Sequence, residues 1–303
     1  MKEFLILSGK GGTGKTSITA CFCELAKNAI AVDCDVDAAN LHLVLNPEIL
    51  VAEDFQSGFI AKVDPEKCTE CGLCKSLCRF NAIEANLLDC SKPVCEISSP
   101  AKVDEINCEG CGVCADNCPA DAISLSDNTI GKLFTSQTKF GKMVHAKLGP
   151  GGENSGKLVT AVRKRASEIA TQSDAQLIII DGPPGIGCPV IASAGGCDFA
   201  VLVTEPTPSG LHDLKRIAEL MKHFDIPAGI VINKADLSKD YCLKIKNFAG
   251  ENSIKMLGEI GYDKNFSQAQ RQNSSLLSYA PKSKTAQAVK NIWTNLEAMN
   301  RIS

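Results

Sequence analysis

Short aliphatic runs alternate with longer helical segments along most of this chain. Five runs are almost wholly apolar, which is typical of strands buried in a parallel sheet: 2–7, 30–32, 177–180, 199–203 and 229–232. Three segments are predicted as helices: 16–27, 157–171 and 285–299. The alternation predicts an α/β fold, with a doubly wound, mostly parallel sheet that carries helices on both faces. Two further strands, 129–134 and 141–148, are predicted to form a hairpin.

A glycine-rich loop follows the first predicted strand directly. Residues 9–16 read Gly-Lys-Gly-Gly-Thr-Gly-Lys-Thr, which is the G-x-x-x-x-G-K-[ST] phosphate-binding pattern between a strand and a helix. Lys15 is predicted to neutralise the β- and γ-phosphates of a nucleotide, and Thr16 to hold Mg²⁺. The other predicted nucleotide contacts of the loop and the helix start are Gly11, Gly12, Thr13, Gly14 and Ser17. The alternative is an ordinary glycine-rich turn.

A second lysine, Lys10, stands inside this loop. With it, the chain resembles the ATPases with a deviant Walker A motif, the group of MinD/ParA, Mrp and the nitrogenase iron protein. The resemblance implies that Lys10 reaches across a dimer interface to the nucleotide of the partner. ATP is then expected to bring two copies of the chain together as a homodimer.

Carboxylates follow two of the predicted strands. Asp181 comes directly after 177–180, which is the Walker B arrangement, and is predicted to orient the water shell of Mg²⁺. Asp33 and Asp35 match the switch I segment of the resembled family. The resemblance implies that Asp33 lies near Mg²⁺ and that Asp35 lies near the attacking water. The alternative is that these acidic residues only cap the next helix.

The resemblance also assigns a site for the base of the nucleotide. Asn233 ends the run 229–232 and matches an asparagine that hydrogen-bonds adenine, for which its amide offers a donor and an acceptor. Asp236 follows in Asn-Lys-Ala-Asp, an arrangement that also occurs in guanine-binding proteins, so ATP as the substrate is implied by the resemblance alone. Pro281 is expected to flank the base from the other side.

An internal repeat of period 40 interrupts the α/β alternation between residues 63 and 126. Each half contains the pattern C-x₂-C-x₂-C-x₃-C, which is the spacing of ligands to a [4Fe–4S] cluster, although paired zinc sites are an alternative. The first run is Cys68, Cys71, Cys74 and Cys78, and the second is Cys108, Cys111, Cys114 and Cys118. The repeat predicts a module at 63–126, inserted into a nucleotide-binding domain formed by 1–62 and 127–303.

The repeat resembles the bacterial two-cluster ferredoxins. The resemblance implies that the fourth cysteine of each run binds the other cluster. Cluster 1 then takes Cys68, Cys71, Cys74 and Cys118, and cluster 2 takes Cys108, Cys111, Cys114 and Cys78. Proline follows the fourth cysteine in that family, as Pro119 does here, but Arg79 stands at the equivalent position of the first run. We expect this difference to alter a turn or one cluster's potential and not to remove a ligand.

Composition narrows the function classes. The 303 residues have a net charge of −3, which gives no basic face for nucleic acid, and no apolar stretch reaches the ~18–20 residues of a membrane span. Eight of the 16 cysteines lie in the two runs, which favours clusters in a reducing cytoplasm over disulfides. Cys90 and Cys95 lie between the runs and are either spare buried cysteines or a third metal or redox site. The helix at 285–299 is predicted to pack on its own sheet, the alternative being a membrane-targeting helix.

The sequence therefore predicts an ATPase that uses Mg²⁺ and converts ATP and water to ADP and phosphate, with two [4Fe–4S] clusters. Our first hypothesis is that an ATP-driven dimer switch controls electron transfer to a redox partner with a basic face, since the module 63–126 is acidic. A second is an ATPase that assembles or carries iron–sulfur or other metal cofactors for an acceptor protein, as in the Mrp branch. A third is a positioning ATPase with structural clusters.

Overall fold

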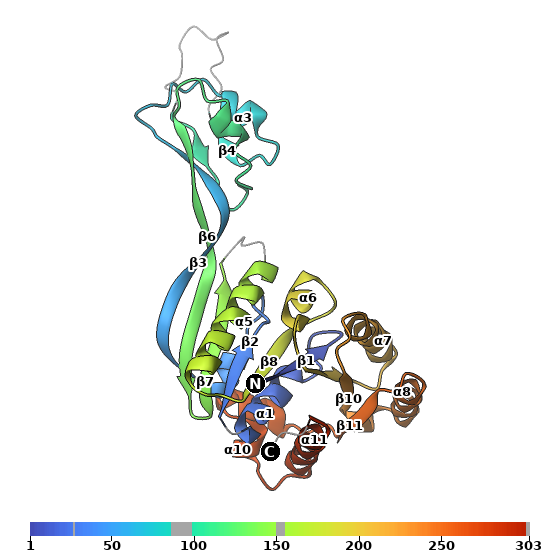
Figure 1. The fold of residues 1–303 in the computed structure, drawn as a ribbon. Coiled ribbons are helices and arrows are strands. Elements are labelled where there is room, and N and C mark those ends of the chain that lie inside the picture. Colours follow the sequence, from blue (N-terminus) through green and yellow to red (C-terminus); the bar gives the residue numbers. More distant parts are fainter. Residues whose placement is uncertain (27, 86–98, 150–154, 301–303) are drawn as a thin grey trace. The chain divides into compact units, whose positions relative to one another are not determined.

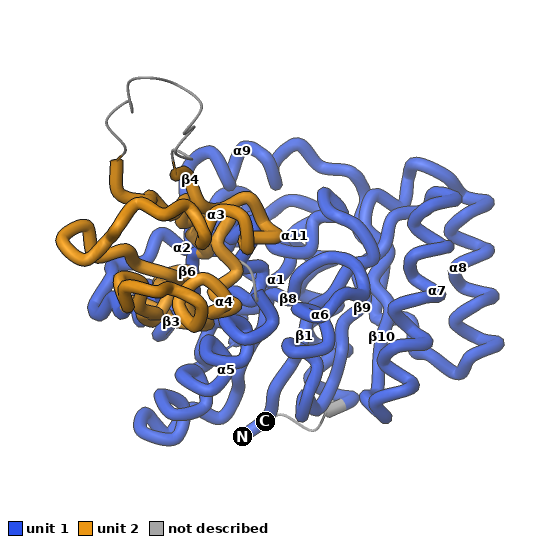
Figure 2. The backbone as a smooth tube through the Cα atoms, turned by 90° about the horizontal axis from the view of Figure 1, so that it is seen from above, with its two compact units in different colours: residues 1–53, 133–147, 155–303 blue, residues 54–132, 148–154 orange. Residues whose placement is uncertain are grey.

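The computed structural model of the chain describes residues 1–26, 28–85, 99–149 and 155–300. The chain divides into two compact units, drawn in blue and orange in Figure 2. The first unit comprises Met1–Glu53, Leu133–Lys147 and Ser155–Ser303, and the second comprises Asp54–Lys132 and Leu148–Asn154. The second unit extends beyond the predicted module 63–126, because two long strands begin or end well outside the cysteine repeat.

One nine-stranded sheet runs through the fold in the order β11-β10-β9-β1-β8-β2-β7-β6-β3 (Figure 1). Its strands are β1 (Lys2–Ser8), β2 (Ala29–Asp33), β3 (Glu48–Val63), β6 (Ile123–Thr138), β7 (Gly141–Leu148), β8 (Leu177–Pro184), β9 (Phe199–Thr204), β10 (Ala228–Asn233) and β11 (Lys255–Ile260). From β11 to β7 each described pairing is parallel. The prediction of a mostly parallel α/β sheet is confirmed, as is the predicted hairpin, which β6 and β7 form.

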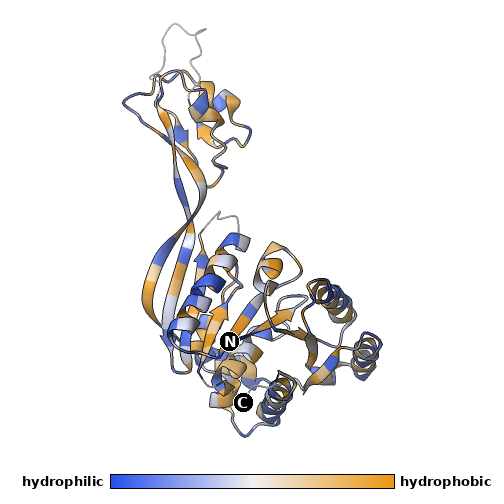
Figure 3. Cartoon of the chain, viewed as in Figure 1, coloured by the Kyte–Doolittle hydropathy of each residue, from blue (hydrophilic) through white to orange (hydrophobic). Residues whose placement is uncertain are grey.

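Helices connect the parallel strands. They are α1 (Lys15–Leu25), α2 (Leu41–Leu45), α5 (Ser155–Gln172), α6 (Cys188–Ala194), α7 (Pro208–His223), α8 (Lys239–Glu251), α9 (Asn265–Arg271), α10 (Leu276–Tyr279) and α11 (Lys284–Asn300). Apolar residues dominate the central strands, whereas α7 and α8 carry both apolar and polar residues, as expected for surface helices with one buried face (Figure 3). Among the described residues, no helix combines the length and apolarity needed to cross a bilayer.

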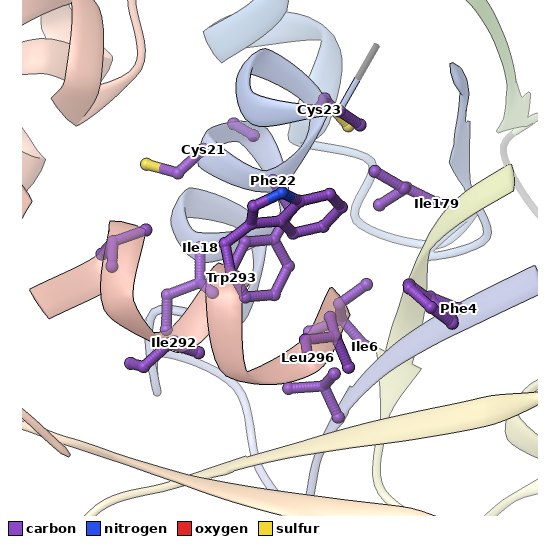
Figure 4. Packing of buried hydrophobic residues seen from close by; sticks show 14 of the residues in the cluster. Phe4, Ile6, Ile18, Cys21, Phe22, Cys23, Ile179, Ile292, Trp293 and Leu296 are labelled. Atoms are coloured by element: carbon purple, nitrogen blue, oxygen red, sulfur yellow. The ribbon is translucent and has the colours of Figure 1, made fainter. Parts of the chain in front are cut away.

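A core cluster lies where α1 and α11 pack against the sheet (Figure 4). Phe22 of α1 and Trp293 of α11 have ring centroids 5.2 Å apart. Phe4 and Ile6, which alternate along β1, belong to the same cluster. The C-terminal helix therefore packs on its own sheet, which confirms the prediction for 285–299.

The second unit preserves the internal repeat in three dimensions. Its short elements are α3 (Leu73–Leu77), α4 (Val113–Asp116), β4 (Ile83–Glu84) and β5 (Lys102–Val103), and β4 pairs antiparallel with β5. The two halves exchange equivalent backbone hydrogen bonds: Asp64 N–H donates to Ala122 O, and Asp104 N–H donates to Ala82 O, both at 2.8 Å. The residue that precedes each cysteine run is therefore hydrogen-bonded to the end of the other half.

Truncation of a core residue on α11 tests the packing of this helix. Leu296 is fully buried, so we expect Leu296→Ala to lower the free energy of unfolding by about 2–5 kcal/mol through lost burial and a residual cavity. Trp293 is the only tryptophan, and its fluorescence during urea unfolding provides the measurement. Leu243→Ala on α8, where the leucine is 59% exposed, is the matched control and is expected to stay within about 0.5 kcal/mol of the original protein. Equal losses in both variants would contradict the described packing.

Candidate functional site

A cavity of about 540 Å³ opens at the carboxyl end of the parallel strands in the first unit. This end of an open α/β sheet is where ligands bind in such folds. The loop between β1 and α1 forms one wall of the cavity. The segment between β2 and α2, the end of β10 and the segment after β11 form other walls. The residues from the predicted site that line it are Gly11, Gly12, Thr13, Gly14, Lys15, Thr16, Ser17, Asp35 and Asn233.

The backbone of the loop requires glycine at two positions. Gly12 and Gly14 have φ angles of +78° and +87°, which side chains other than glycine rarely adopt. A Cβ on Gly14 would also lie 2.4 Å from the side-chain nitrogen of Asn233. Between these glycines, Thr13 is buried and its hydroxyl oxygen has no hydrogen-bond partner among the described residues. A buried polar atom without a partner at a phosphate loop fits the binding of a polar ligand.

Asp181 holds the residues that the motif assigns to phosphate and Mg²⁺. Lys15 Nζ donates to Asp181 Oδ1 at 2.8 Å, and Thr16 Oγ1 donates to Asp181 Oδ2 at 2.6 Å. Thr19, one turn further along α1, donates to Oδ1 at 2.9 Å. The carboxylate is fully buried and does not itself line the cavity, but it binds Lys15 and Thr16, which do.

A second buried carboxylate lies beside Asp181. Asp33 of β2 pairs in register with Asp181 of β8, and it is also fully buried. It accepts backbone N–H groups from Asp35 at 3.1 Å and from Leu41 at 3.0 Å, which shapes the segment between β2 and α2. Burial raises the pKa of Asp33 to about 7, and the negative charge of Asp181 adds to this rise while Lys15 opposes it. A divalent cation would relieve this repulsion, so the donor set fits Mg²⁺.

Asp35 lines the same cavity at its edge. Burial is also the main cause that raises the pKa of Asp35, and the charge of Asp181 acts in the same direction. The structure therefore brings Asp33, Asp35 and Asp181 close to Lys15. What each carboxylate does during hydrolysis stays a prediction.

The predicted base-binding residues are only partly brought together. Asn233 is buried, lines the cavity and donates from Nδ2 to Thr13 O at 2.7 Å. Asp236 and Pro281 are not among the residues that line the cavity. Asp236 instead accepts the backbone N–H of Tyr262 at 2.6 Å. The contacts of both residues with a base stay predictions.

Two aromatic side chains that were not predicted from the sequence also line the cavity. Tyr262 follows β11 and is 57% exposed, and Phe266 lies on α9. Neither belongs to a recognisable motif. The only signal in the sequence was their place just after a parallel strand, where ligand-binding loops gather.

Lys10 lies on the surface of the loop, with 34% of its side chain exposed. Its ammonium group lies 3.3 Å from Glu205 Oε2 and donates to Ser209 Oγ at 3.2 Å. Glu205 also forms an ion pair with Lys234, whose ammonium group donates to Gly12 O at 3.2 Å. Within one chain, Lys10 therefore contacts Glu205, which lies between β9 and α7, and Ser209, which lies at the start of α7.

Two smaller cavities in the second unit are lined by the cysteines of the repeat. The first is lined by Cys68, Cys71, Cys74 and Cys118, and the second by Cys108, Cys111, Cys114 and Cys78. Backbone N–H groups of Ala82 and Ala122 donate to the sulfurs of Cys78 and Cys118 at 3.4 and 3.3 Å. The described residues contain no group of three or more His, Cys, Asp or Glu arranged around a single metal ion. Cys90 and Cys95 lie outside the described residues.

Together, the parallel sheet and the phosphate loop define a P-loop nucleotide-binding protein. Residues 4–276 match the family described as the CobQ/CobB/MinD/ParA nucleotide binding domain, and the chain belongs to this family. It is accordingly a MinD/ParA-type ATPase.

Similar proteins include two from Methanocaldococcus jannaschii. The uncharacterized protein MJ0578 is 34% identical over 254 residues, which are 80% of this chain and 82% of that protein. The uncharacterized protein MJ0579 is 28% identical over 264 residues, 81% and 87% of the two chains. Among solved structures, the septum site-determining protein MinD from Pyrococcus horikoshii, complexed with Mg-ADP, has a TM-score of 0.59 at 18% identity over 99% of this chain and 97% of that one. The cell division ATPase MinD from Pyrococcus furiosus has the same TM-score at 19% identity, covering 98% and 99%.

Removing the charge of Asp181 tests the centre of this site. We expect Asp181→Asn to lower kcat for ATP hydrolysis with Mg²⁺ by about 100-fold, because a buried, preorganised electrostatic contact is lost. Phosphate release by the full chain at saturating ATP provides the measurement. The control is Asp225→Asn, which changes an exposed aspartate after α7 and is expected to retain the original rate. Unchanged hydrolysis by Asp181→Asn would show that the cavity is not where ATP is hydrolysed.

Proposed function

We propose that this ATPase is a switch that controls electron transfer through two [4Fe–4S] clusters. The observation that carries the proposal is the grouping of eight cysteines into two cavities of four, in the same chain as a phosphate loop. Each cavity takes three cysteines from one run and one from the other. This is the exchange of fourth ligands that is characteristic of two-cluster ferredoxins.

The chemistry of the two cavities supports clusters as their occupants. The ligands of a four-iron cluster attach at separate iron atoms, so a lining of four cysteines in each cavity suits it. Burial raises the pKa of the Cys74 and Cys114 thiols, which occupy equivalent positions in the repeat. Iron would offset this cost because it binds the thiolate form. The N–H groups of Ala82 and Ala122 supply hydrogen bonds to sulfur of the kind that tune cluster potentials.

For the nucleotide, we propose ATP with Mg²⁺. The phosphate loop and Lys15 bind the phosphates, and Thr16, Asp33 and Asp181 hold Mg²⁺ and its water shell, which supplies positive charge to the transferring phosphoryl group. Asp35 lies at the cavity edge, where it positions the attacking water. The MinD protein of Pyrococcus horikoshii, a fold relative, is complexed with Mg-ADP, which supports this choice.

The base of the nucleotide is proposed to bind between Asn233 and Tyr262. Asn233 offers a donor and an acceptor, which a purine edge requires. In the structure its amide contacts the backbone of the loop and of Lys234, so nucleotide binding must exchange one of these hydrogen bonds. The exposed ring of Tyr262 lines the cavity beside it and can stack on a base.

Dimer formation is proposed as the response of the protein to ATP binding. Lys10 is a flexible cation on the surface of the phosphate loop, and within the chain its partner is Glu205. A γ-phosphate presented by a second copy is a stronger acceptor for this cation than a carboxylate shared with Lys234. Exchange of Glu205 for the partner's nucleotide would move Lys10 and leave the ion pair between Glu205 and Lys234 in place.

A cofactor-carrying ATPase is the second candidate. The observation that favours it is the exposure of Cys71 and Cys111, one ligand in each set, from which a cluster can be transferred to an acceptor protein. In that case the iron content falls during ATP turnover in the presence of an apo acceptor. Under the first proposal, the iron stays bound and only its oxidation state changes.

Substitution of a fourth ligand tests the cluster assignment. We expect the original chain, purified without oxygen, to contain about eight iron atoms and Cys118→Ser to contain about four, because one cluster loses a ligand. Iron and acid-labile sulfide analysis provides the measurement. As the control, Cys197→Ser changes a buried cysteine of the first unit that follows α6, and this variant is expected to retain all iron. Full iron content in Cys118→Ser, or none in the original chain, would contradict two clusters.

Substitution of Lys10 tests the dimer. We expect the ATP-bound form of the full chain to be a dimer by light scattering, in an Asp35→Ala background that slows hydrolysis. Adding Lys10→Ala is expected to leave it a monomer, while ATP binding falls by less than about tenfold because Lys15 is intact. Lys139→Ala, on the β6–β7 turn, is the control that should still dimerise. A dimer that persists without Lys10 would exclude this role.

A further inference from the structure

The two cysteine-lined cavities are matched in most respects. In both, the second cysteine of the run is exposed and the others are half-buried. In both, the fourth thiol accepts a backbone N–H group at nearly the same distance. One glutamate lines each cavity, Glu70 the first and Glu109 the second. Because these features are the same in both halves of the repeat, the cavities differ mainly in the charged residues near them.

A positive charge lies at the first cavity. Lys75, which follows Cys74, donates from its ammonium group to Ala85 O at 2.8 Å, and Ala85 lines the first cavity. The equivalent position in the second half of the repeat is Ala115, which has no charge. Arg79 is exposed, and neither Arg79 nor Lys75 is among the described residues that line the two cavities; of the two, it is Lys75 that donates to a lining residue.

A negative charge lies at the second cavity. Asp116 Oδ2 lies 3.9 Å from the point where a Cβ on Gly112 would stand, and Gly112 lines the second cavity. The equivalent residue in the first half is the neutral Ser76. The charge of this carboxylate therefore has no counterpart at the first cavity.

The aspartate that precedes each run adds to the same difference. Asp64 lies 3.5 Å from the ammonium group of Lys67, so its charge is balanced. The equivalent Asp104 accepts a hydrogen bond from the neutral amide of Asn107 at 2.5 Å, where Asp64 has a cation. Both differences make the surroundings of the second cavity more negative than those of the first.

From these charges, and on the basis of the proposed function, we infer that the two clusters have different reduction potentials and that the cluster in the first cavity has the higher one. Reduction adds one electron to a cluster that is already negative with its four thiolates. A nearby cation stabilises the reduced form, and a nearby carboxylate destabilises it. Lys75 thus makes the first cluster the acceptor inside the module, and Asp116 makes the second the donor.

Internal transfer then has a direction. An electron supplied by a one-electron donor protein would rest on the first cluster, where Lys75 would stabilise the added charge, with one electron lost by the donor and one gained by the module. No proton or bond would be exchanged, and a one-electron acceptor would remove the electron from there.

The test is an anaerobic redox titration of the full chain with dithionite, followed by electron paramagnetic resonance. We expect two separate potentials in the original chain. Lys75→Met, which keeps the length of the side chain, is expected to lower the higher potential only. Asp116→Asn and Ala115→Lys are each expected to raise the lower potential only, and Ala115→Lys adds a charge without removing a contact. Lys132→Met, which removes a lysine of the same unit that lines neither cavity, is expected to shift neither potential.

One shared potential in a chain with about eight iron atoms would overturn this inference and leave the cluster proposal intact. A shift of the lower potential by Lys75→Met would also overturn it, because the lysine would then act on the second cluster. A chain without iron would overturn both proposals. If Lys75→Met loses iron, Ala115→Lys is the deciding variant: a rise of the lower potential alone supports the inference, and any other result overturns it.

Discussion

The buried contact between Lys15 and Asp181 is the interaction on which the nucleotide site depends. Only 6% of the lysine side chain and none of the aspartate side chain is exposed, so each charge relies on the other in place of water. The pair connects the start of α1 to the end of β8 and thereby joins the phosphate loop to the centre of the sheet. Under the proposed function, a nucleotide with Mg²⁺ would exchange contacts with this pair.

Under the proposed function, that exchange would give the site a second arrangement. In the described structure Asp181 binds Lys15, Thr16 and Thr19, and Lys10 is held by Glu205. A bound triphosphate offers both lysines stronger acceptors, and a bound cation offers Asp33 and Asp181 relief from their mutual repulsion. The segments attached to these residues are those that follow β2 and β9. A change of ligand therefore changes loops and not the buried sheet.

Much of this arrangement could be predicted from the sequence because it depends on local patterns. The loop at 9–16 fixes its own conformation through Gly12 and Gly14, and the apolar runs fix the strands that flank it. The period-40 repeat likewise identified the cysteines that share a cavity, once the exchange of fourth ligands was assumed. The walls contributed by Tyr262 and Phe266 could not be predicted, because only the order of strands in the sheet brings the end of β11 beside the phosphate loop. The long strand β3 was also missed, and only 129–134 of the longer β6 was predicted, since their exposed residues lack the apolar pattern of buried strands.

The central claim is that ATP and the clusters influence each other within one protein. The most direct measurement is the reduction potential of each cluster in the anaerobic full chain, with Mg²⁺ and either a non-hydrolysable ATP analogue or no nucleotide. The account predicts that the analogue shifts at least one potential or alters its paramagnetic spectrum, and that Lys10→Ala abolishes the change. Two intact clusters whose potentials and spectra are the same in both conditions would contradict it.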